Sequence, residues 1–310
     1  MAIDAEQLIQ QIGTSLQADD SLRAYLLIDP MLYEPIDAER IAAAALQRWD
    51  IPVRRPGIDD DKRPYLLELR ATAVEILEAS VVAAIAELEN PELESTRGFA
   101  VGGWLLSEEP GDVLVRHFSN IMSPIEPGHG IRYFRLADRR VLEWMWPVLE
   151  SGQHASLMRP IRQWLVLDRR GAVVRYVPPQ VSPEPMAAGM PLLQLTEAQW
   201  RHAHRCEEVQ QMLRGWRAFE DALPHDYLKQ ADHAVASARS IGLAESADIV
   251  LLGAYQLMLH PRLTEHPRIF KAVEDARDQG IPLGLALEKI PDPEGWDAIR
   301  RDLERADVPA

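Results

Sequence analysis

Two groups of polar residues have side chains that could bind a metal ion. His202 and Cys206 lie four residues apart and would share one face of a helix, as two zinc ligands can, with His225 or His233 as further candidates. The acidic run 59–61 could hold a divalent cation, because magnesium and calcium prefer oxygen ligands. Neither pattern completes a ligand set. We therefore predict no metal site and no cofactor site, and we interpret these residues as a half-buried helix face and a solvated loop.

The sequence lacks the motifs that mark common catalytic sites. There is no GxGxxG or GxxxxGK[ST] phosphate loop and no GxSxG nucleophile motif. Gly102-Gly103 interrupts an apolar run, which predicts close packing against a neighbour. No pair of carboxylates is distinguished by its spacing, so we predict no catalytic residue. The alternative is a hydrolase whose dispersed acidic residues converge only in the folded chain.

Charge and composition exclude several classes of partner. The chain has 310 residues and a formal net charge of −15, without a basic cluster in the sequence, so nucleic acid is not an expected partner. The single cysteine, Cys206, fits a reducing compartment. The N-terminus does not resemble a signal peptide, and the longest uncharged apolar stretch, 249–259, is too short to span a bilayer. We expect a cytoplasmic protein without membrane insertion.

The first part of the chain alternates apolar runs with helical patterns, which predicts a mixed α/β lobe over residues 1–177. Short apolar runs predict strands, and apolar residues at three- and four-residue steps predict helices. Asp37 is expected to cap a helix that continues to about Trp49. The expected strands are 24–28, 65–69, 99–106, 131–136, 163–167 and 172–177, and the expected helices are 4–18, 37–49, 74–88, 114–121 and one that begins at Asp138.

A linker and a helical lobe are expected next. Five prolines fall within residues 178–191, and proline disrupts both helices and strand ladders, so we place a linker at 178–194. Thr196 and Gln199 then have the spacing of a capping box. Residues 195–310 show only helical periodicity. The expected helices are 197–220, 225–241, 246–259, 267–279, 282–289 and 294–306. The predicted fold is therefore α+β, with an N-terminal mixed α/β lobe that contains a β-sheet and flanking helices, followed by an all-helical C-terminal lobe.

Three residues outside these patterns are candidate contacts for a partner protein. His129 lies between two glycines in the expected hairpin turn 126–130, where an exposed turn residue is the simpler interpretation. Trp49 and Trp296 fall near expected helix ends, and tryptophan is favoured both in cores and at interface hot spots. We predict that these three side chains are exposed contacts.

A family resemblance enters at residues 132–142, which read Arg-Tyr-Phe-Arg-Leu-Ala-Asp-Arg-Arg-Val-Leu. This stretch resembles the F-R-aromatic-aromatic-D-P-R-V-L signature of the type VI secretion effector adaptor family, the Tap or TEC chaperones, which were long catalogued only as a domain of unknown function. Residues 25–29 look like the opening strand of that family, and residues 159–168 look like its G-P-V-R-R-W-L-V-P-D segment. The three pieces have the family's order and spacing, and the resemblance covers residues 22–200.

The signature also suggests roles for its residues. Ala137 and Arg139 replace an aromatic residue and a proline of the signature. Phe134 is expected to point into the core and Asp138 to cap the following helix, while Arg135 and Arg139 are predicted partner contacts. The predicted structural residues of the family motifs are Asp29, Phe134, Asp138 and Trp164.

The resemblance implies a protein that binds a toxic effector in the producing cell and helps it to join the secretion spike, through the VgrG protein or its PAAR tip. Adaptors of this family have no cofactor and are not known as enzymes, so we expect a non-enzymatic chaperone whose partners are a type VI effector and a spike component. Contact through apolar patches, or by a peptide laid along a sheet edge, would suit this role. A toxin-binding protein of the immunity type is a further alternative.

Overall fold

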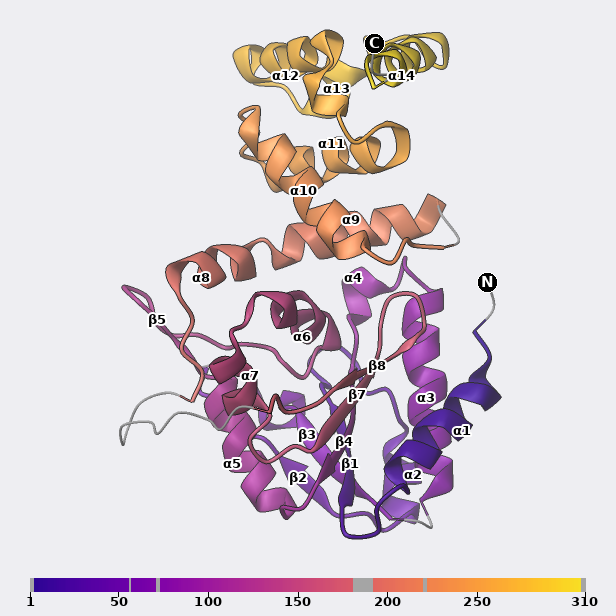
Figure 1. Cartoon of the computed structure of the whole chain (residues 1–310), viewed down its shortest axis with the longest axis vertical. Helices are drawn as coiled ribbons and strands as arrows, with labels where there is room; N and C mark the ends of the chain where they lie inside the picture. Colours follow the sequence, from indigo (N-terminus) through magenta and orange to yellow (C-terminus); the bar gives the residue numbers. More distant parts are fainter. Residues whose placement is uncertain (1–2, 56, 71–72, 181–191, 220–221, 308–310) are drawn as a thin grey trace. The chain divides into compact units, whose positions relative to one another are not determined.

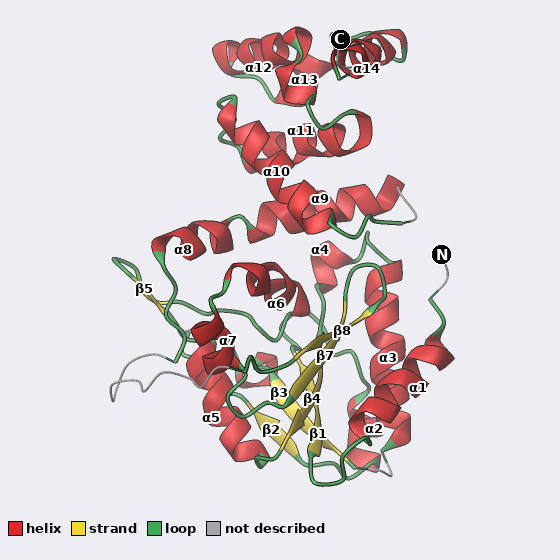
Figure 2. Ribbon diagram, viewed as in Figure 1, coloured by secondary structure: helices red, strands yellow, loops and turns green. Residues whose placement is uncertain are grey.

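The chain folds into two compact units, Met1–Ala203 and His204–Ala310 (Figure 1). The computed structural model describes residues 3–55, 57–70, 73–180, 192–219 and 222–307. Within the predicted linker 178–194, residues 181–191 lie outside this described part. The first unit contains a β-sheet and the second unit is helical, which confirms the predicted α+β class (Figure 2).

The first unit extends past residue 195, where we expected the helical lobe to begin. The helix α8 (Glu197–His204) starts with the predicted capping box, in which the Thr196 hydroxyl accepts from the Gln199 amide at 3.3 Å. The Gln199 side chain also donates to the Val148 carbonyl at 2.7 Å. The His202 ring stacks on Trp144 at 3.7 Å between centroids. These contacts join most of α8 to the first unit.

A six-stranded antiparallel sheet forms the centre of the first unit. Its order is β2 (Arg48–Asp50), β3 (Tyr65–Leu69), β1 (Arg23–Ile28), β4 (Val101–Ser107), β7 (Gln163–Leu167) and β8 (Val173–Tyr176). The central strands read as continuous apolar runs because both faces of the sheet are covered.

Helices cover the two faces of the sheet (Figure 2). On one face lie α1 (Ala5–Leu16) and α3 (Val74–Glu89), whose apolar side chains form one core cluster with alternate residues of the strands. On the other face lies α5 (Gly111–Ile121), from which Phe118 meets the Trp164 ring edge-on at 5.6 Å. The short helices α6 (Arg139–Met145) and α7 (Ser151–Leu157) complete that side.

The predicted close packing at Gly102-Gly103 is confirmed. A Cβ atom at Gly102 would lie 2.4 Å from the carbonyl oxygen of Ala137, and one at Gly103 would lie 2.3 Å from that of Leu165. Gly103 also has a φ of 120°, which L side chains rarely adopt. The glycines therefore allow the segment before α6 and strand β7 to approach β4 closely.

Three local expectations are corrected by the structure. The helix expected over 37–49 ends early: α2 covers only Ala38–Ala43, and Trp49 lies on the edge strand β2. The expected second hairpin strand is reduced to β6 (Gly130–Ile131), paired with β5 (Ile125–Glu126). Helix α7 was not expected, although Glu150 and Gln153 form a capping box at its start.

The second unit consists of α-helices and one short 3₁₀ helix within its described residues. Its elements are α9 (Cys206–Phe219), α10 (Tyr227–Ser240), α11 (Ser246–Leu259), the 3₁₀ helix η3 (Leu263–Glu265), α12 (Pro267–Gln279), α13 (Leu283–Leu287) and α14 (Glu294–Ala306). The expected helices are confirmed apart from 197–220, which is interrupted between α8 and α9. None of the described helices is long and apolar enough to cross a membrane.

Candidate functional site

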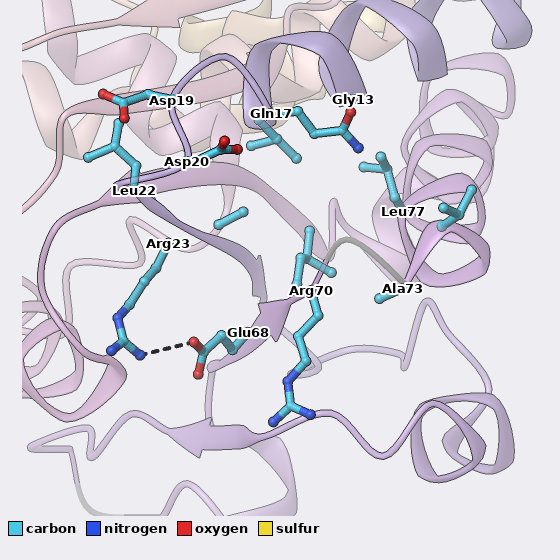
Figure 3. A pocket seen from close by; sticks show the side chains of 14 residues that line it. Gly13, Gln17, Asp19, Asp20, Leu22, Arg23, Glu68, Arg70, Ala73 and Leu77 are labelled. Carbon is cyan, nitrogen blue, oxygen red and sulfur yellow. Dashed lines mark hydrogen bonds and ion pairs between the residues drawn. The ribbon is translucent and has the colours of Figure 1, made fainter.

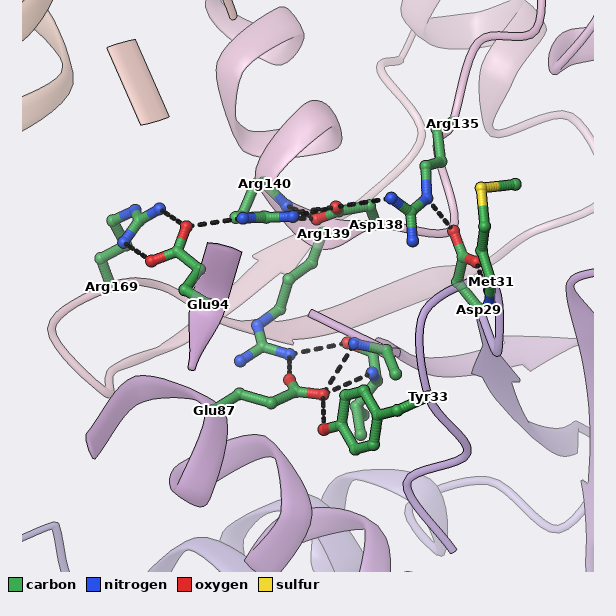
Figure 4. A network of polar contacts seen from close by, with 12 residues as sticks. Asp29, Met31, Tyr33, Glu87, Glu94, Arg135, Asp138, Arg139, Arg140 and Arg169 are labelled. Carbon is green, nitrogen blue, oxygen red and sulfur yellow. Dashed lines mark hydrogen bonds and ion pairs between the residues drawn. The ribbon is translucent and has the colours of Figure 1, made fainter. Parts of the chain in front are cut away.

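The resemblance segment 132–142 carries a network of polar contacts in the first unit (Figure 4). Its arginines and Asp138 meet carboxylates that come from the end of β1, from α3 and from the short helix α4 (Glu94–Arg97). Because strand order and helix packing bring these segments together, residues far apart in the sequence form one cluster. This network is the candidate functional site.

Arg139 lies at the centre of the network and is 2% exposed. Its guanidinium forms an ion pair with Glu87 of α3. The remaining donors bond to backbone carbonyls: Nη1 donates to Val101 at 2.8 Å, and Nη2 donates to Ala84 at 3.0 Å. Nε donates to the carbonyl of Leu167 at 3.1 Å. The side chain thus links α3, β4 and β7 and has no accessible donor for a ligand.

Glu87 is saturated in the same way. Besides Arg139, its carboxylate accepts from the Tyr33 hydroxyl at 2.7 Å and from the backbone N–H of Ala100 and Val101 at 2.7 and 3.1 Å. A buried carboxylate needs such partners, since the loss of hydration would otherwise cost several kcal/mol. The pair Glu87–Arg139 is therefore suited to holding the helix against the sheet.

A second part of the network runs in a line from Arg169 to Asp138 (Figure 4). Glu94 receives two bonds from Arg169, at 2.6 and 3.0 Å, and one from Arg140 at 2.6 Å. Arg140 also bonds Asp138 at 2.6 Å. Burial alone would raise the pKa values of Glu94 and Asp138, but the neighbouring arginines outweigh it and hold both pKa values below their usual range. Both carboxylates therefore stay ionised and paired at neutral pH.

The Phe99 ring lies among these arginines. The guanidinium carbons of Arg139, Arg140 and Arg169 lie 4.3, 4.8 and 5.3 Å from its centroid. Arginine over an aromatic face gains attraction when both groups are desolvated. Phe99 is 1% exposed, so it supports the three guanidinium groups from within the core.

Asp29 and Arg135 form the other end of the network, where Asp29 is buried and Arg135 is partly exposed. The Arg135 Nε donates to Asp29 at 2.5 Å, and Asp29 also accepts from the Met31 amide at 3.1 Å. Burial raises the pKa of Asp29, against the effect of Arg135. Arg135 keeps about a fifth of its side chain exposed, so within the motif it is placed for a partner contact in a way that Arg139 is not.

The predicted structural residues lie where the resemblance suggests. Phe134 is buried, the Asp138 carboxylate caps α6 by accepting from the Arg140 amide at 3.1 Å, and Asp29 is buried at the end of β1. Trp164 lies in the core and donates to the Gly102 carbonyl at 3.0 Å. The predicted partner contact at Arg139 is wrong, because its donors are all directed into the protein interior.

The other predicted contacts lie apart from this network. His129 is exposed in the turn between β5 and β6. Trp49 is half-buried, and its ring lies where a Cβ atom at Gly111 would stand. Trp296 is also half-buried and stacks on Tyr255 at 4.7 Å. The two tryptophans therefore contribute to packing, and only His129 is fully placed at the surface.

No cluster of three or more histidine, cysteine, aspartate or glutamate side chains is arranged to hold a metal among the described residues. His202, one of the candidate ligands, instead bonds the Trp144 carbonyl through Nε2 at 3.0 Å. The acidic run 59–61 forms part of a short 3₁₀ turn, where Asp60 pairs with Arg63 at 2.7 Å.

A groove of about 330 Å³ opens where β1 and β3 meet α1 and α3 (Figure 3). Arg23 and Glu68 form an ion pair of 3.1 Å beside Arg70 on one side, and Asp19 bonds its own neighbour Ser21 on the other. The groove is lined by both acidic and basic side chains, and its acidic residues Asp19 and Glu68 already have hydrogen-bond or ion-pair partners. It has no evident selectivity for a charged ligand.

Several members of the network were not recognised from the sequence. Glu87, Glu94, Arg140 and Arg169 lie in ordinary amphipathic or turn contexts, and their partners are distant in the sequence. Glu87 lies beside the predicted apolar stripe of the helix 74–88 and not on it, so no sequence pattern marked it as buried. His117 is a second missed group: it is buried on α5, and its Nε2 lies 2.7 Å from the Leu157 carbonyl.

Residues 60–156 match the family model described as Domain of unknown function (DUF4123). The matched segment contains α3, α4, α5 and α6, and with them Glu87, Glu94 and the resemblance segment 132–142. No curated protein and no solved structure matches the chain. The matched segment thus coincides with most of the polar network but ends before β7, β8 and the helical unit.

Proposed function

We propose that this protein is a type VI secretion adaptor that binds a toxic effector and promotes its loading onto the spike, at VgrG or its PAAR tip, without covalent chemistry. The observation that carries the proposal is the match of residues 60–156 to a domain associated with such adaptors, over the segment that also bears the F-R-x-x-D signature. The signature lies within the matched residues, so both observations concern the same segment of the chain.

The geometry of the network supports a binding role. Its carboxylates accept from arginines, from Tyr33 or from backbone N–H groups, and its central arginine donates only to groups of the same unit. A catalytic acid or base has to reach a substrate proton, and Glu87 and Asp138 are buried behind their partners. The network therefore acts as a rigid support for the surface of the first unit.

Co-expression with a candidate toxin effector tests the proposal. The tagged full chain should retain the toxin, and the purified pair should retain the spike tip, whereas the chain without toxin should retain less of the tip. The toxin should keep its catalytic activity when it is bound in the complex. Loss of that activity through contact with the catalytic domain would instead favour an immunity-type inhibitor, and failure to retain the toxin would refute the proposal.

A further inference from the structure

The β5–β6 hairpin and the adjacent loop form a surface that combines exposed arginines with exposed isoleucines. We define this hairpin surface by Arg54, Arg55, Ile125, Ile131 and Arg132. Arg54 donates to the Asn120 side chain at 3.0 Å, and the Pro52 carbonyl accepts from Ser119 at 2.7 Å, so the loop lies along the end of α5. The hairpin starts directly after that end.

Further backbone contacts join the hairpin to the residues that follow α5. The Arg132 amide bonds the Pro124 carbonyl, and the Phe134 amide bonds the Met122 carbonyl, both at 2.9 Å. The loop 52–55 and the hairpin are thus two separate segments that both lie against the C-terminal end of α5.

The charge of this surface is opposite to that of the chain. Arg54 and Arg55 are exposed, and neither forms an ion pair with any residue the structure describes. Arg132 is 44% exposed, whereas the side chain of its partner Glu126 is 8% exposed, so the positive group is the one that faces the solvent. In a chain with a net charge of −15, this local excess of arginine selects for a negatively charged partner.

The apolar part of the surface is a single cross-strand pair. Ile125 lies directly opposite Ile131, and each is 50% exposed. The strands β5 and β6 form a sheet of their own, with no third strand among the described residues. Cβ atoms at Gly128 and Gly130 would meet nothing within 4 Å, so the turn stands clear of its surroundings. The hairpin therefore has no third strand paired beside it among the described residues, and it carries an exposed aliphatic pair.

We propose that the hairpin surface binds an extended, acidic segment of the partner protein that carries aliphatic side chains. The segment adds to the hairpin edge, its aliphatic groups cover Ile125 and Ile131, and its carboxylates meet Arg54, Arg55 and Arg132. Extended peptides bind sheet edges through main-chain bonds and alternate side chains, and arginine pairs with carboxylates in a bidentate geometry. This assignment rests on the proposed adaptor function, because it names where the effector or spike component would be held.

The test uses a fluorescein-labelled peptide of about twelve residues that alternates glutamate with valine, the smallest probe with both features. Fluorescence anisotropy with the full chain should give saturable binding that weakens as salt is raised, because exposed charges are screened. A matched peptide with lysine in place of glutamate should bind at least tenfold more weakly. Equal binding of both peptides, or no binding of the acidic one, overturns the assignment.

Two variants locate the binding site. The double substitution Arg54→Glu/Arg55→Glu should lower affinity for the acidic peptide about tenfold or more, since two favourable contacts become repulsive. The control Arg300→Glu/Arg301→Glu changes the net charge equally at another exposed pair of adjacent arginines and should leave affinity within about twofold. Ile131→Thr should weaken binding severalfold, and Val177→Thr, at a similarly exposed valine, should not. Equal losses in variant and control overturn the assignment.

Retention of the toxin separates this inference from the proposed function. If the wild-type chain retains the toxin and Arg54→Glu/Arg55→Glu retains it equally well, the adaptor function stands and the hairpin surface is refuted as its site. If the toxin is not retained at all, the adaptor function fails, and the peptide titrations still decide whether the hairpin surface binds acidic segments.

Discussion

Replacing Arg139 by methionine should lower the free energy of unfolding of the first unit far more than replacing an exposed arginine. Methionine fills much of the space of the arginine stem but cannot donate a hydrogen bond. The substitution leaves the Glu87 carboxylate buried without its counter-ion and removes the bonds to the carbonyls of Ala84, Val101 and Leu167. Removal of one partner of a buried ion pair costs about 3–5 kcal/mol.

The size of the loss can be divided by a double-mutant cycle. With Glu87→Gln already present, the neutral amide can still accept from Tyr33, so Arg139→Met should cost about 2 kcal/mol less than it costs alone. A total loss of about 4 kcal/mol corresponds to a fall in Tm of roughly 10 °C for a unit of this size. The exposed Arg40→Met on α2 serves as the control and should change stability by no more than about 0.5 kcal/mol.

Urea unfolding followed by near-UV circular dichroism measures these differences. Trp104 and Trp164 are buried in the sheet and report on the packing that Arg139 supports. Toxin retention separates a structural role from a binding role. At a temperature where the Arg139→Met protein remains folded, this protein should still retain the toxin. An Arg139→Met protein as stable as Arg40→Met would refute the assignment of Arg139 as the link between helix and sheet.

Two further predictions concern buried sites of the first unit. Burial lowers the pKa of His117 to about 4, while the pKa in the unfolded chain is 6.5. The stabilisation of the folded state by the neutral ring is therefore complete above pH 6.5, and it is lost as the pH falls towards 4. Relative to His117→Gln, the wild type should lose about 3 kcal/mol over that range, measured by urea unfolding at each pH, and parallel pH profiles would contradict this. Gly102→Ala places a Cβ atom 2.4 Å from the Ala137 carbonyl oxygen and should destabilise by about 2 kcal/mol, whereas Gly152→Ala meets nothing within 4 Å and should stabilise by about 0.5–1 kcal/mol in thermal unfolding. Equal changes in stability at the two glycines would show that the segment before α6 does not lie too close to β4 for a Cβ atom at Gly102.

Much of the fold follows from local patterns in the sequence. The strands at 24–28, 65–69 and 163–167 are short apolar runs, and the helix at 74–88 has an unbroken apolar stripe, so their types were predictable. Asp138 and Thr196 act through neighbours three residues away or less, which is why both caps were found in advance. Sequence patterns therefore predicted the elements that are specified by residues within the element itself.

The remaining features depend on contacts that sequence spacing does not reveal. Strand β2 is a three-residue edge strand that contains Arg48 and Asp50, so no apolar run marks it, and it forms because β3 lies beside it. Arg139 looks like an exposed residue of an arginine-rich segment, but it is buried because Glu87, far away in the sequence, supplies its counter-ion. For the same reason both Arg135 and Arg139 were predicted as partner contacts, although Arg139 is buried in an ion pair with Glu87 and only Arg135 is partly exposed.

The retention of a candidate toxin tests the central proposal most directly. Isothermal titration of the purified full chain with candidate toxins from neighbouring genes should give a saturable one-to-one complex with one of them, and addition of the spike tip should give a larger assembly on gel filtration. A toxin that produces no heat of binding and elutes separately from the chain at micromolar concentrations would contradict the account.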